Sequence, residues 1–168
     1  PAGNRRAIPA AIWILGFVSM LMDISSEMIH ALLPIYMVTV LGTSTLAVGI
    51  IDLDGFKPVN DTYGHSVGDR VLIEAARRIS DVCDSVGDNV HLARLGGDEF
   101  GLIVAGDPED DELLALGRQI TERIQLPYEL DTAHTGVSCS TGFALYPRSA
   151  TAADALYECA DYALYHAK

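Results

Sequence analysis

Apolar and polar residues recur along this chain with two periods, one typical of strands and one typical of helices. Short apolar runs that end at Gly, Asp or Pro predict strands, and apolar residues at every third or fourth position predict helices. The predicted strands cover residues 46–53, 90–95, 100–105, 128–131 and 137–146. The predicted helices cover residues 56–63, 67–86, a segment around 113–124, and a final stretch after residue 151. This alternation predicts an α+β domain in which helices flank a mostly antiparallel sheet.

The last third of the domain is expected to hold a strand pair and a helix. Strands 128–131 and 137–146 would pair around the polar turn at residues 132–136. Thr151 would cap the final helix, because a threonine side chain can accept a hydrogen bond from the first helical turn. The helix would face the core through Leu156, Ala160, Ala163, Leu164 and Ala167.

The first part of the chain has a different composition. Residues 8–22 and residues 29–51 are uncharged runs of 15 and 23 residues, and the longer run is long enough to span a bilayer. Arg5 and Arg6 precede the first run and favour a cytoplasmic N-terminus. We therefore divide the chain into an apolar, transmembrane-like helical segment, residues 1–45, and a folded domain, residues 46–168. The domain would be cytoplasmic and tethered to the inner membrane through residues 8–45.

Charge and cysteine content narrow the range of partners. The formal net charge is −12, and all of it arises after residue 51. An acidic domain of this kind is a poor nucleic-acid binder, since phosphate contacts need a basic face, so a substrate with several phosphates must arrive with divalent cations. Cys83, Cys139 and Cys159 are scattered, which fits ordinary buried thiols in a reducing compartment.

Residues 94–100, Arg-Leu-Gly-Gly-Asp-Glu-Phe, form the first candidate site. The two glycines between apolar runs predict a tight β-hairpin, whose turn requires positive φ. Asp98 and Glu99 then place two like charges at its tip. Such a pair is stable when it is solvated, hydrogen-bonded or bound to a cation. An ordinary solvated acidic turn is the alternative.

Residues 51–69 form the second candidate site. A buried strand that ends in Asp52 would deliver this carboxylate to the edge of a sheet. The helix start at residues 55–58 offers backbone N–H groups that suit phosphate oxygens. Asn60 and Asp69 could read a base edge by hydrogen bonds. Each also has a structural interpretation, Asn60 as a turn residue and Asp69 as an acid in the first turn of a helix.

Taken together, these motifs resemble the GGDEF family, the diguanylate cyclases, over about residues 46–168. The matching positions are residues 52–54, 56–57, 60–61, 63–65, 68–69, 94–100, 140–144 and 160–168. The resemblance implies a sandwich of the nucleotidyl-cyclase type. It also implies that the domain is truncated at both ends, because the family's opening helix is absent and the chain stops at Lys168, before the family's last strand.

The resemblance further implies an activity, the condensation of two GTP molecules into cyclic di-GMP with release of pyrophosphate, by a homodimer in bacterial signalling. Two Mg²⁺ or Mn²⁺ ions would serve each active site. The implied metal ligands are Asp52, the Leu53 carbonyl, Asp98 and Glu99. Asp98 and Glu99 are also the implied catalytic residues, Glu99 assisting the metal or deprotonating the 3′-hydroxyl.

The remaining implied roles concern substrate binding. Asn60 and Asp69 would bind the guanine. The Phe56 and Lys57 amides and Lys168 would hold the terminal phosphates. Gly96 and Gly97 would let the nucleotide lie against the hairpin.

Other positions have structural interpretations or depart from the family. Asp54 is expected to fix a turn, Arg94 to pair with a carboxylate, and Asp161 to serve as a structural partner. The family's product-inhibition motif, Arg-x-x-Asp, is replaced at residues 87–90 by Gly-Asp-Asn-Val, so feedback binding there should be absent or weak.

Two further interpretations concern the origin and the activity of the chain. The domain could be a non-catalytic, GTP-binding regulator, because residues 125–128 resemble GGDEF domains that are joined to a downstream EAL phosphodiesterase. Residues 1–50 resemble the first transmembrane segment of a major-facilitator transporter. The chain would then be a junction of two unlike segments near residues 48–51.

Overall fold

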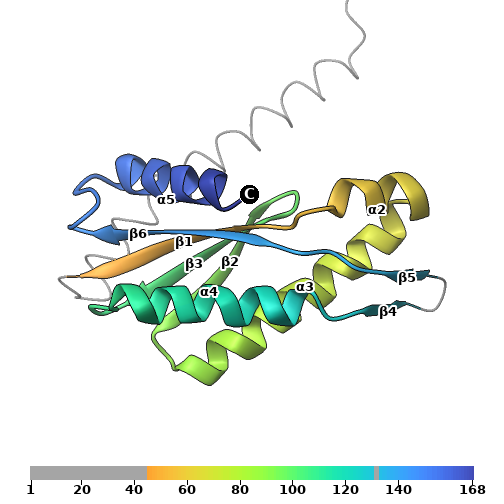
Figure 1. Ribbon diagram of the computed structural model, residues 1–168, viewed down its shortest axis with the longest axis horizontal. Helices are drawn as coiled ribbons and strands as arrows, with labels where there is room; N and C mark the ends of the chain where they lie inside the picture. The colour runs from red at the N-terminus through yellow and green to blue at the C-terminus, as the bar shows by residue number, and fades with distance from the viewer. Residues whose placement is uncertain (1–44, 131–132) are drawn as a thin grey trace, which may run out of the picture. The chain divides into compact units, whose positions relative to one another are not determined.

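The computed structural model describes residues 45–130 and 133–168, which are organised around a four-stranded antiparallel sheet (Figure 1). Its strands are β1 (Leu46–Asp52), β2 (Val90–Gly96), β3 (Glu99–Ala105) and β6 (Ser140–Tyr146). They lie in the order β2-β3-β1-β6, and each neighbouring pair is antiparallel. β1 is therefore a central strand, as its nearly continuous apolar sequence predicts.

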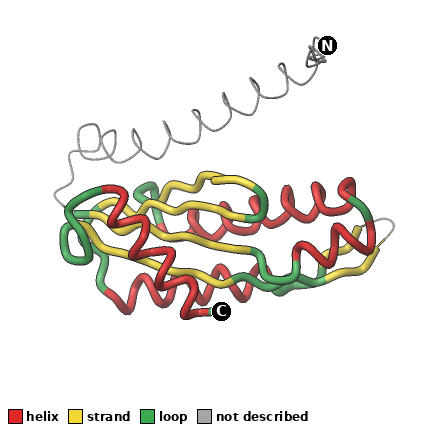
Figure 2. The backbone as a smooth tube through the Cα atoms, turned by 90° about the horizontal axis from the view of Figure 1, so that it is seen from above, coloured by secondary structure: helices red, strands yellow, loops and turns green. Residues whose placement is uncertain are grey.

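Helices cover both faces of this sheet, as the views in Figures 1 and 2 show. They are α2 (Phe56–Tyr63), α3 (His65–Val86), α4 (Asp110–Ile124) and α5 (Ala153–Ala167). On one face, Val71 and Ile79 of α3 and Ile120 of α4 join the core beneath Phe100 and Leu102 of β3. α5 lies on the opposite face. These contacts confirm the predicted α+β sandwich.

Gly142 of β6 sets how closely α5 approaches the sheet. A Cβ at this position would lie 2.2 Å from both the Ala160 carbonyl oxygen and the Leu164 backbone nitrogen. Backbone atoms cannot move aside as flexible side chains can, so only glycine fits here. This close contact fixes the end of α5, where Lys168 lies.

The predicted pairing of residues 128–131 with residues 137–146 is wrong. β4 (Tyr128–Leu130) instead pairs with β5 (Ala133–Thr135) in a separate two-stranded sheet. β6 starts only at Ser140 and pairs along its length with β1. β1 and β6 are far apart in the chain, and the local sequence pattern does not reveal which distant strand β6 pairs with.

The predicted cap at Thr151 also needs correction, whereas the predicted hairpin is confirmed. α5 begins at Ala153 with Ala152 as its N-cap and no side-chain hydrogen bond there, and Ala167 is exposed. Packing against β6 decides where this helix starts, since tertiary contacts outweigh local capping. In the β2–β3 turn only Gly97 has a positive φ, of 52°.

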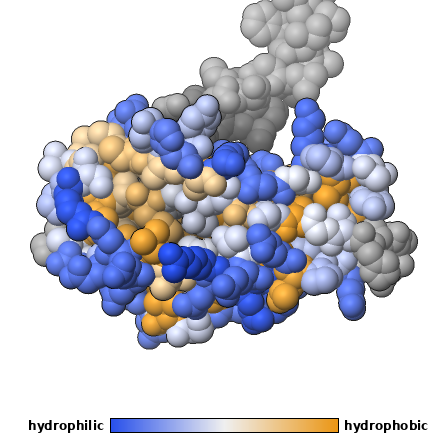
Figure 3. Space-filling model, in the orientation of Figure 1, coloured by the Kyte–Doolittle hydropathy of each residue, from blue (hydrophilic) through white to orange (hydrophobic). Residues whose placement is uncertain are grey.

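The apolar helical segment predicted for residues 1–45 lies almost wholly outside the described residues, so the predicted division of the chain and the membrane contact through residues 8–45 stay predictions. Within residues 45–130 and 133–168, no helix is long and apolar enough to cross a membrane. The surface of this part shows hydrophilic residues with apolar patches between them (Figure 3). Single exposed apolar side chains of this kind are normal for a folded domain.

Candidate functional site

Three carboxylate-bearing residues meet where β1 ends and β3 begins. Asp52 and Glu99 are direct antiparallel partners, so their side chains lie on the same face of the sheet with Cβ atoms about 5 Å apart. The Leu53 N–H donates to the Asp98 carbonyl at 3.2 Å, which ties the hairpin turn to the end of β1. We call Asp52, Asp98 and Glu99 the acidic end. The sequence-predicted carboxylates therefore come from segments about 46 residues apart in the chain and reach one end of the sheet.

The electrostatics of the acidic end show that these charges act on one another. Burial raises the pKa of Glu99, and the negative charges of Asp52, Asp98 and Asp161 raise it further, while Lys168 lowers it. The Lys168 Nζ lies 2.8 Å from Asp52 Oδ1, and this contact raises the pKa of Lys168. One ammonium group faces several carboxylates, so the acidic end has an excess of negative charge.

The donor chemistry of the acidic end suits a hard divalent cation, because carboxylate and carbonyl oxygens are the ligands that Mg²⁺ takes in proteins. Burial and the neighbouring carboxylates raise the pKa of Glu99, and a cation placed among these oxygens would oppose that shift. Among the residues that the structure describes, no three His, Cys, Asp or Glu side chains form a ready-made metal cluster. The residues present therefore fit a cation in chemical type, and Lys168 forms an ion pair with Asp52.

The start of α2 lies directly beside the acidic end. Its N-cap, Gly55, has a φ of 83°, and no side chain caps the helix. The Phe56 N–H makes only a long hydrogen bond of 3.4 Å, to the Leu53 carbonyl. Phe56 itself is buried, and Lys57 is exposed. This helix start can receive anionic oxygens, as the sequence predicts.

Asn60 of α2 lies against the beginning of α3. A Cβ on Gly68 would come within 1.9 Å of Asn60 Oδ1, so glycine at this position leaves the space that the Asn60 side chain occupies. Asp69, the next residue, is exposed. The two residues predicted to read a base thus lie on adjoining helices, with Asn60 next to the residue that precedes Asp69.

The hairpin tip is open on its outer side. A Cβ on Gly96 or Gly97 would meet no atom within 4 Å. Arg94 donates from Nε and Nη2 to the Gly97 carbonyl at 3.1 and 2.7 Å and thereby closes the turn. Arg94 therefore stabilises the turn through a carbonyl, and the predicted partner, a carboxylate, was wrong.

Sequence reasoning missed three residues near the acidic end. Asp161, expected to be a structural partner, and Tyr157 both lie on α5 close enough to Glu99 for their charges to interact. Ser140 donates to Asp54 Oδ2 at 2.7 Å, which confirms that Asp54 fixes a turn. The spacing of Tyr157 and Asp161, one helical turn apart, could have indicated a shared face. Nothing in the sequence pattern places that face beside Glu99.

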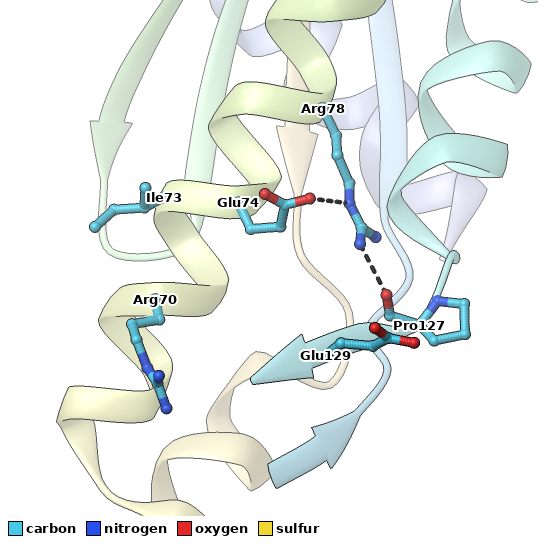
Figure 4. A pocket seen from close by; sticks show the side chains of 6 residues that line it. All are labelled: Arg70, Ile73, Glu74, Arg78, Pro127 and Glu129. Atoms are coloured by element: carbon cyan, nitrogen blue, oxygen red, sulfur yellow. Dashed lines mark hydrogen bonds and ion pairs between the residues drawn. The ribbon is translucent and has the colours of Figure 1, made fainter. Parts of the chain in front are cut away.

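A cavity of about 440 Å³ lies elsewhere, between α3 and β4. Its lining residues are Arg70, Ile73, Glu74, Arg78, Pro127 and Glu129 (Figure 4). None of the residues predicted for the candidate site lines it. The chemistry therefore has to be argued at the acidic end and not at this cavity.

Comparison with known proteins identifies the family of this chain. Residues 38–168 match the family described as "Diguanylate cyclase, GGDEF domain". The chain therefore belongs to the GGDEF family. The transporter-like interpretation of residues 1–50 receives no support from this match, which begins at residue 38.

Two curated relatives are much longer than the segment that they share with this chain. The bifunctional diguanylate cyclase/cyclic di-GMP phosphodiesterase MucR of Pseudomonas aeruginosa is 46% identical over 123 residues, which are 73% of this chain and 17% of MucR. The diguanylate cyclase DgcN of Escherichia coli is 39% identical over 126 residues, which are 74% of this chain and 30% of DgcN. The chain thus spans less than a third of either relative.

A solved structure supports the fold independently. The isolated GGDEF domain of TpbB, also called YfiN, from Pseudomonas aeruginosa superposes with a TM-score of 0.68 and 39% sequence identity. The match covers 74% of this chain and 72% of that chain. The antiparallel sheet flanked by helices is therefore the fold of this family.

Proposed function

We propose that this domain is a diguanylate cyclase that condenses two GTP molecules into cyclic di-GMP. The observation that carries the proposal is the convergence of Asp52, Asp98 and Glu99 beside the uncapped start of α2. That arrangement combines an anion-binding helix start with carboxylates that need a cation, which suits a nucleoside triphosphate with bound metal ions. Membership of the GGDEF family supports the choice of GTP.

The proposed reaction balances as two identical substitutions. The 3′-hydroxyl oxygen of each GTP forms a bond to the α-phosphorus of the other GTP, and the bond between the α-phosphorus and the bridging oxygen breaks. Two pyrophosphates leave, and each hydroxyl gives up its proton. Because each domain binds one GTP, two copies must face each other, and we propose a homodimer as the catalytic form.

Each residue of the site has a role in this reaction. Glu99 accepts the hydroxyl proton or helps to hold a metal ion. Asn60 and Asp69 hydrogen-bond the guanine and reject adenine, whose edge would leave them unpaired. The Phe56 and Lys57 amides and Lys168 bind the terminal phosphates, and Gly96 and Gly97 leave room for the nucleotide.

Metal ions complete the proposed site. Asp52, the Leu53 carbonyl, Asp98 and Glu99 would hold Mg²⁺ or Mn²⁺, two ions per site. When bound, such ions neutralise the charge that develops on the transferred phosphoryl group. On binding of a cation, Lys168 would be released from Asp52 and become available to the phosphates, so one group serves both states of the site.

A non-catalytic GTP-binding domain is the second candidate function. The similarity to MucR, whose name includes a phosphodiesterase, favours this alternative, because a partner domain could then carry the activity. The complete Gly-Gly-Asp-Glu-Phe sequence at residues 96–100 favours catalysis. Placement in the cytoplasm and attachment to the inner membrane through residues 8–45 also stay predictions, which cell fractionation can test.

Turnover and binding assays on the same preparation separate these functions. The chain is incubated with GTP and Mg²⁺, and cyclic di-GMP and pyrophosphate are quantified by chromatography. The proposal predicts both products in a ratio of one to two, and none for Asp52→Asn. Binding of GTP without product would favour the regulatory function, and absence of GTP binding would contradict both.

A further inference from the structure

The loop between β1 and α2 is fixed by a set of hydrogen bonds to the segment that leads into β6. The Ser140 Oγ donates to Asp54 Oδ2 at 2.7 Å. The Asp54 N–H donates to the Ser138 carbonyl at 3.0 Å, and the Ser138 N–H donates to the Asp54 carbonyl at 3.2 Å. We call Asp54, Ser138 and Ser140 the Asp54 clamp.

The central bond of the Asp54 clamp is a strong one. Ser140 is only 8% exposed, and its hydroxyl donates to a carboxylate, which makes the hydrogen bond charge-assisted. Gln125, the C-cap of α4, also donates to Ser138 Oγ at 3.0 Å. The Asp54 clamp therefore links the loop to β6 and to the end of α4.

The same loop is held on its other side by the hairpin. The Leu53 N–H donates to the Asp98 carbonyl at 3.2 Å. Gly55 follows directly after these two attachments, and its φ of 83° turns the chain into α2. Since α2 has no side-chain cap, the conformation of this loop, together with the burial of Phe56 and Val59, sets where the amides of its first turn point.

We infer that Asp54 and Ser140 are positioning residues that hold the first turn of α2 in the orientation that binds the GTP phosphates. This inference rests on the proposed function and adds to it a pair of residues outside the acidic end. Asp54 acts as a hydrogen-bond acceptor for Ser140 and not as a metal ligand. Asp52, in contrast, forms the ion pair with Lys168 and faces Glu99.

The test compares nucleotide affinities of the full chain, four single variants and the double variant of Asp54→Ala and Ser140→Ala. Ser140→Ala and Asp54→Ala remove the bond from its two ends, so either one suffices if the other fails to fold. Asp54→Asn keeps an acceptor oxygen but removes the charge. Ser85→Ala is the matched control, because the Ser85 hydroxyl also donates a single bond, to the Val82 carbonyl at 2.6 Å, far from this loop in sequence.

The probes are non-hydrolysable analogues of GTP and of ATP, measured with Mg²⁺ by calorimetry. Ser140→Ala and Asp54→Ala should each lower the affinity for the GTP analogue about tenfold, which is the effect of losing one charge-assisted hydrogen bond. The double variant should lose little more than either single variant, since both remove the same bond. Asp54→Asn should fall between wild type and Asp54→Ala, because it keeps an acceptor oxygen for Ser140 but loses the charge assistance, and the ratio of GTP to ATP affinity should not change.

The outcomes separate this inference from the proposed function. If the wild type binds the GTP analogue and Ser140→Ala binds it equally well, the inference fails and the proposed function stands. An Asp54→Asn variant as weak as Asp54→Ala would show that the charge matters, and would also overturn the inference. If the wild type binds no GTP analogue, the proposed function itself fails, and the inference falls with it.

Discussion

Two clusters of charged side chains in the described part of the protein differ in how their charges are balanced. At the acidic end, Asp52, Asp98, Glu99 and Asp161 share the single ammonium group of Lys168. At the other cluster, which we call the arginine anchor, one buried arginine meets enough acceptors for its donors. The acidic end therefore needs a bound cation to balance its negative charge. The arginine anchor needs no ligand, because the chain itself supplies the acceptors for its donors.

The arginine anchor is centred on Arg78 of α3, which is 8% exposed. Its Nε pairs with Glu74 at 2.8 Å, and its guanidinium carbon lies 4.0 Å from the centre of the Tyr128 ring. Its two terminal nitrogens donate to the carbonyls of Arg123, Ile124, Leu126 and Pro127. These carbonyls end α4 and begin the β4 segment, where helical partners are missing. Arg78 therefore stabilises the fold.

The cavity of about 440 Å³ lies at the arginine anchor and not at the acidic end (Figure 4). A concave shape alone does not indicate chemistry, because the polar groups that line this cavity include a satisfied ion pair. At the acidic end, burial and the charges of neighbouring carboxylates raise the pKa of Glu99. Perturbed carboxylates are the better indicator of a site here.

The largest expected effect comes from a substitution at the acidic end. Glu99→Gln should lower cyclic di-GMP synthesis by at least about a hundredfold, because it removes a charge where metal and 3′-hydroxyl meet. Glu129→Gln, at the cavity, is the matched control and should leave synthesis unchanged. Product is measured by chromatography at saturating GTP. Equal losses in both variants would remove the distinction between the two clusters.

The next largest effect is a loss of stability on substitution at the arginine anchor. Arg78→Met should lower the free energy of unfolding by about 2–4 kcal/mol, since several carbonyls lose a buried donor. Its neighbour Arg77 is the control, because its ion pairs with Glu74 and Asp81 are exposed and Arg77→Met should cost less than about 0.5 kcal/mol. Denaturant unfolding measures both. A destabilisation of similar size in the two variants would contradict a special role for Arg78.

A smaller effect concerns base selection beside the acidic end. Asp69→Ala should lower the affinity for a GTP analogue about tenfold and leave the affinity for inorganic triphosphate unchanged, because only a hydrogen bond to the base is lost. Gly68→Ala should act in the same direction, since a Cβ there would displace Asn60. Asp61→Ala, at an exposed site on α2, is the control. Parallel losses for GTP and triphosphate would place Asp69 outside the base site.

The smallest effect is a difference in the sign of the pH dependence. A hydrogen bond from Arg77 is the largest cause that lowers the pKa of Glu74, to about 2 from 4.5, so the folded state loses stability as the pH falls through that window. The raised pKa of Glu99 has the opposite sign: without metal ions, stability falls as the pH rises from about 4.5 through the higher folded value. Unfolding free energies of Glu74→Gln and Glu99→Gln between pH 3 and pH 7 should therefore deviate from wild type in opposite directions. Deviations of the same sign would contradict the comparison.

Much of the fold is visible in local sequence, and most of the errors involve distant contacts. α2 has the bounds that its pattern predicts, and the β2–β3 hairpin follows from its glycines. The partner of β6 and the start of α5 depend on packing across the sheet, which no local signal encodes. The short β5 strand was missed because three residues are too few to show a period.

The residues of the candidate site also divide into those that local sequence identifies and those that depend on distant contacts. The sequence pattern and the family resemblance identify Asp52, Asp98 and Glu99, because strand ends and a glycine turn are local features. Ser140 and Tyr157 could not be assigned, since their relation to Asp54 and Glu99 exists only once β6 and α5 have packed. Arg78 looks like an ordinary helical arginine until its acceptors, about 45 to 49 residues away, come together around it.

A structure of the chain with a non-hydrolysable GTP analogue and Mg²⁺ tests the central claim most directly. The account predicts the base beside Asn60 and Asp69, the phosphates at the first turn of α2 and Lys168, and metal density at Asp52 and Glu99. It also predicts that Lys168 no longer pairs with Asp52. A nucleotide bound in the cavity at Arg78, with the Asp52–Lys168 pair intact, would contradict the account.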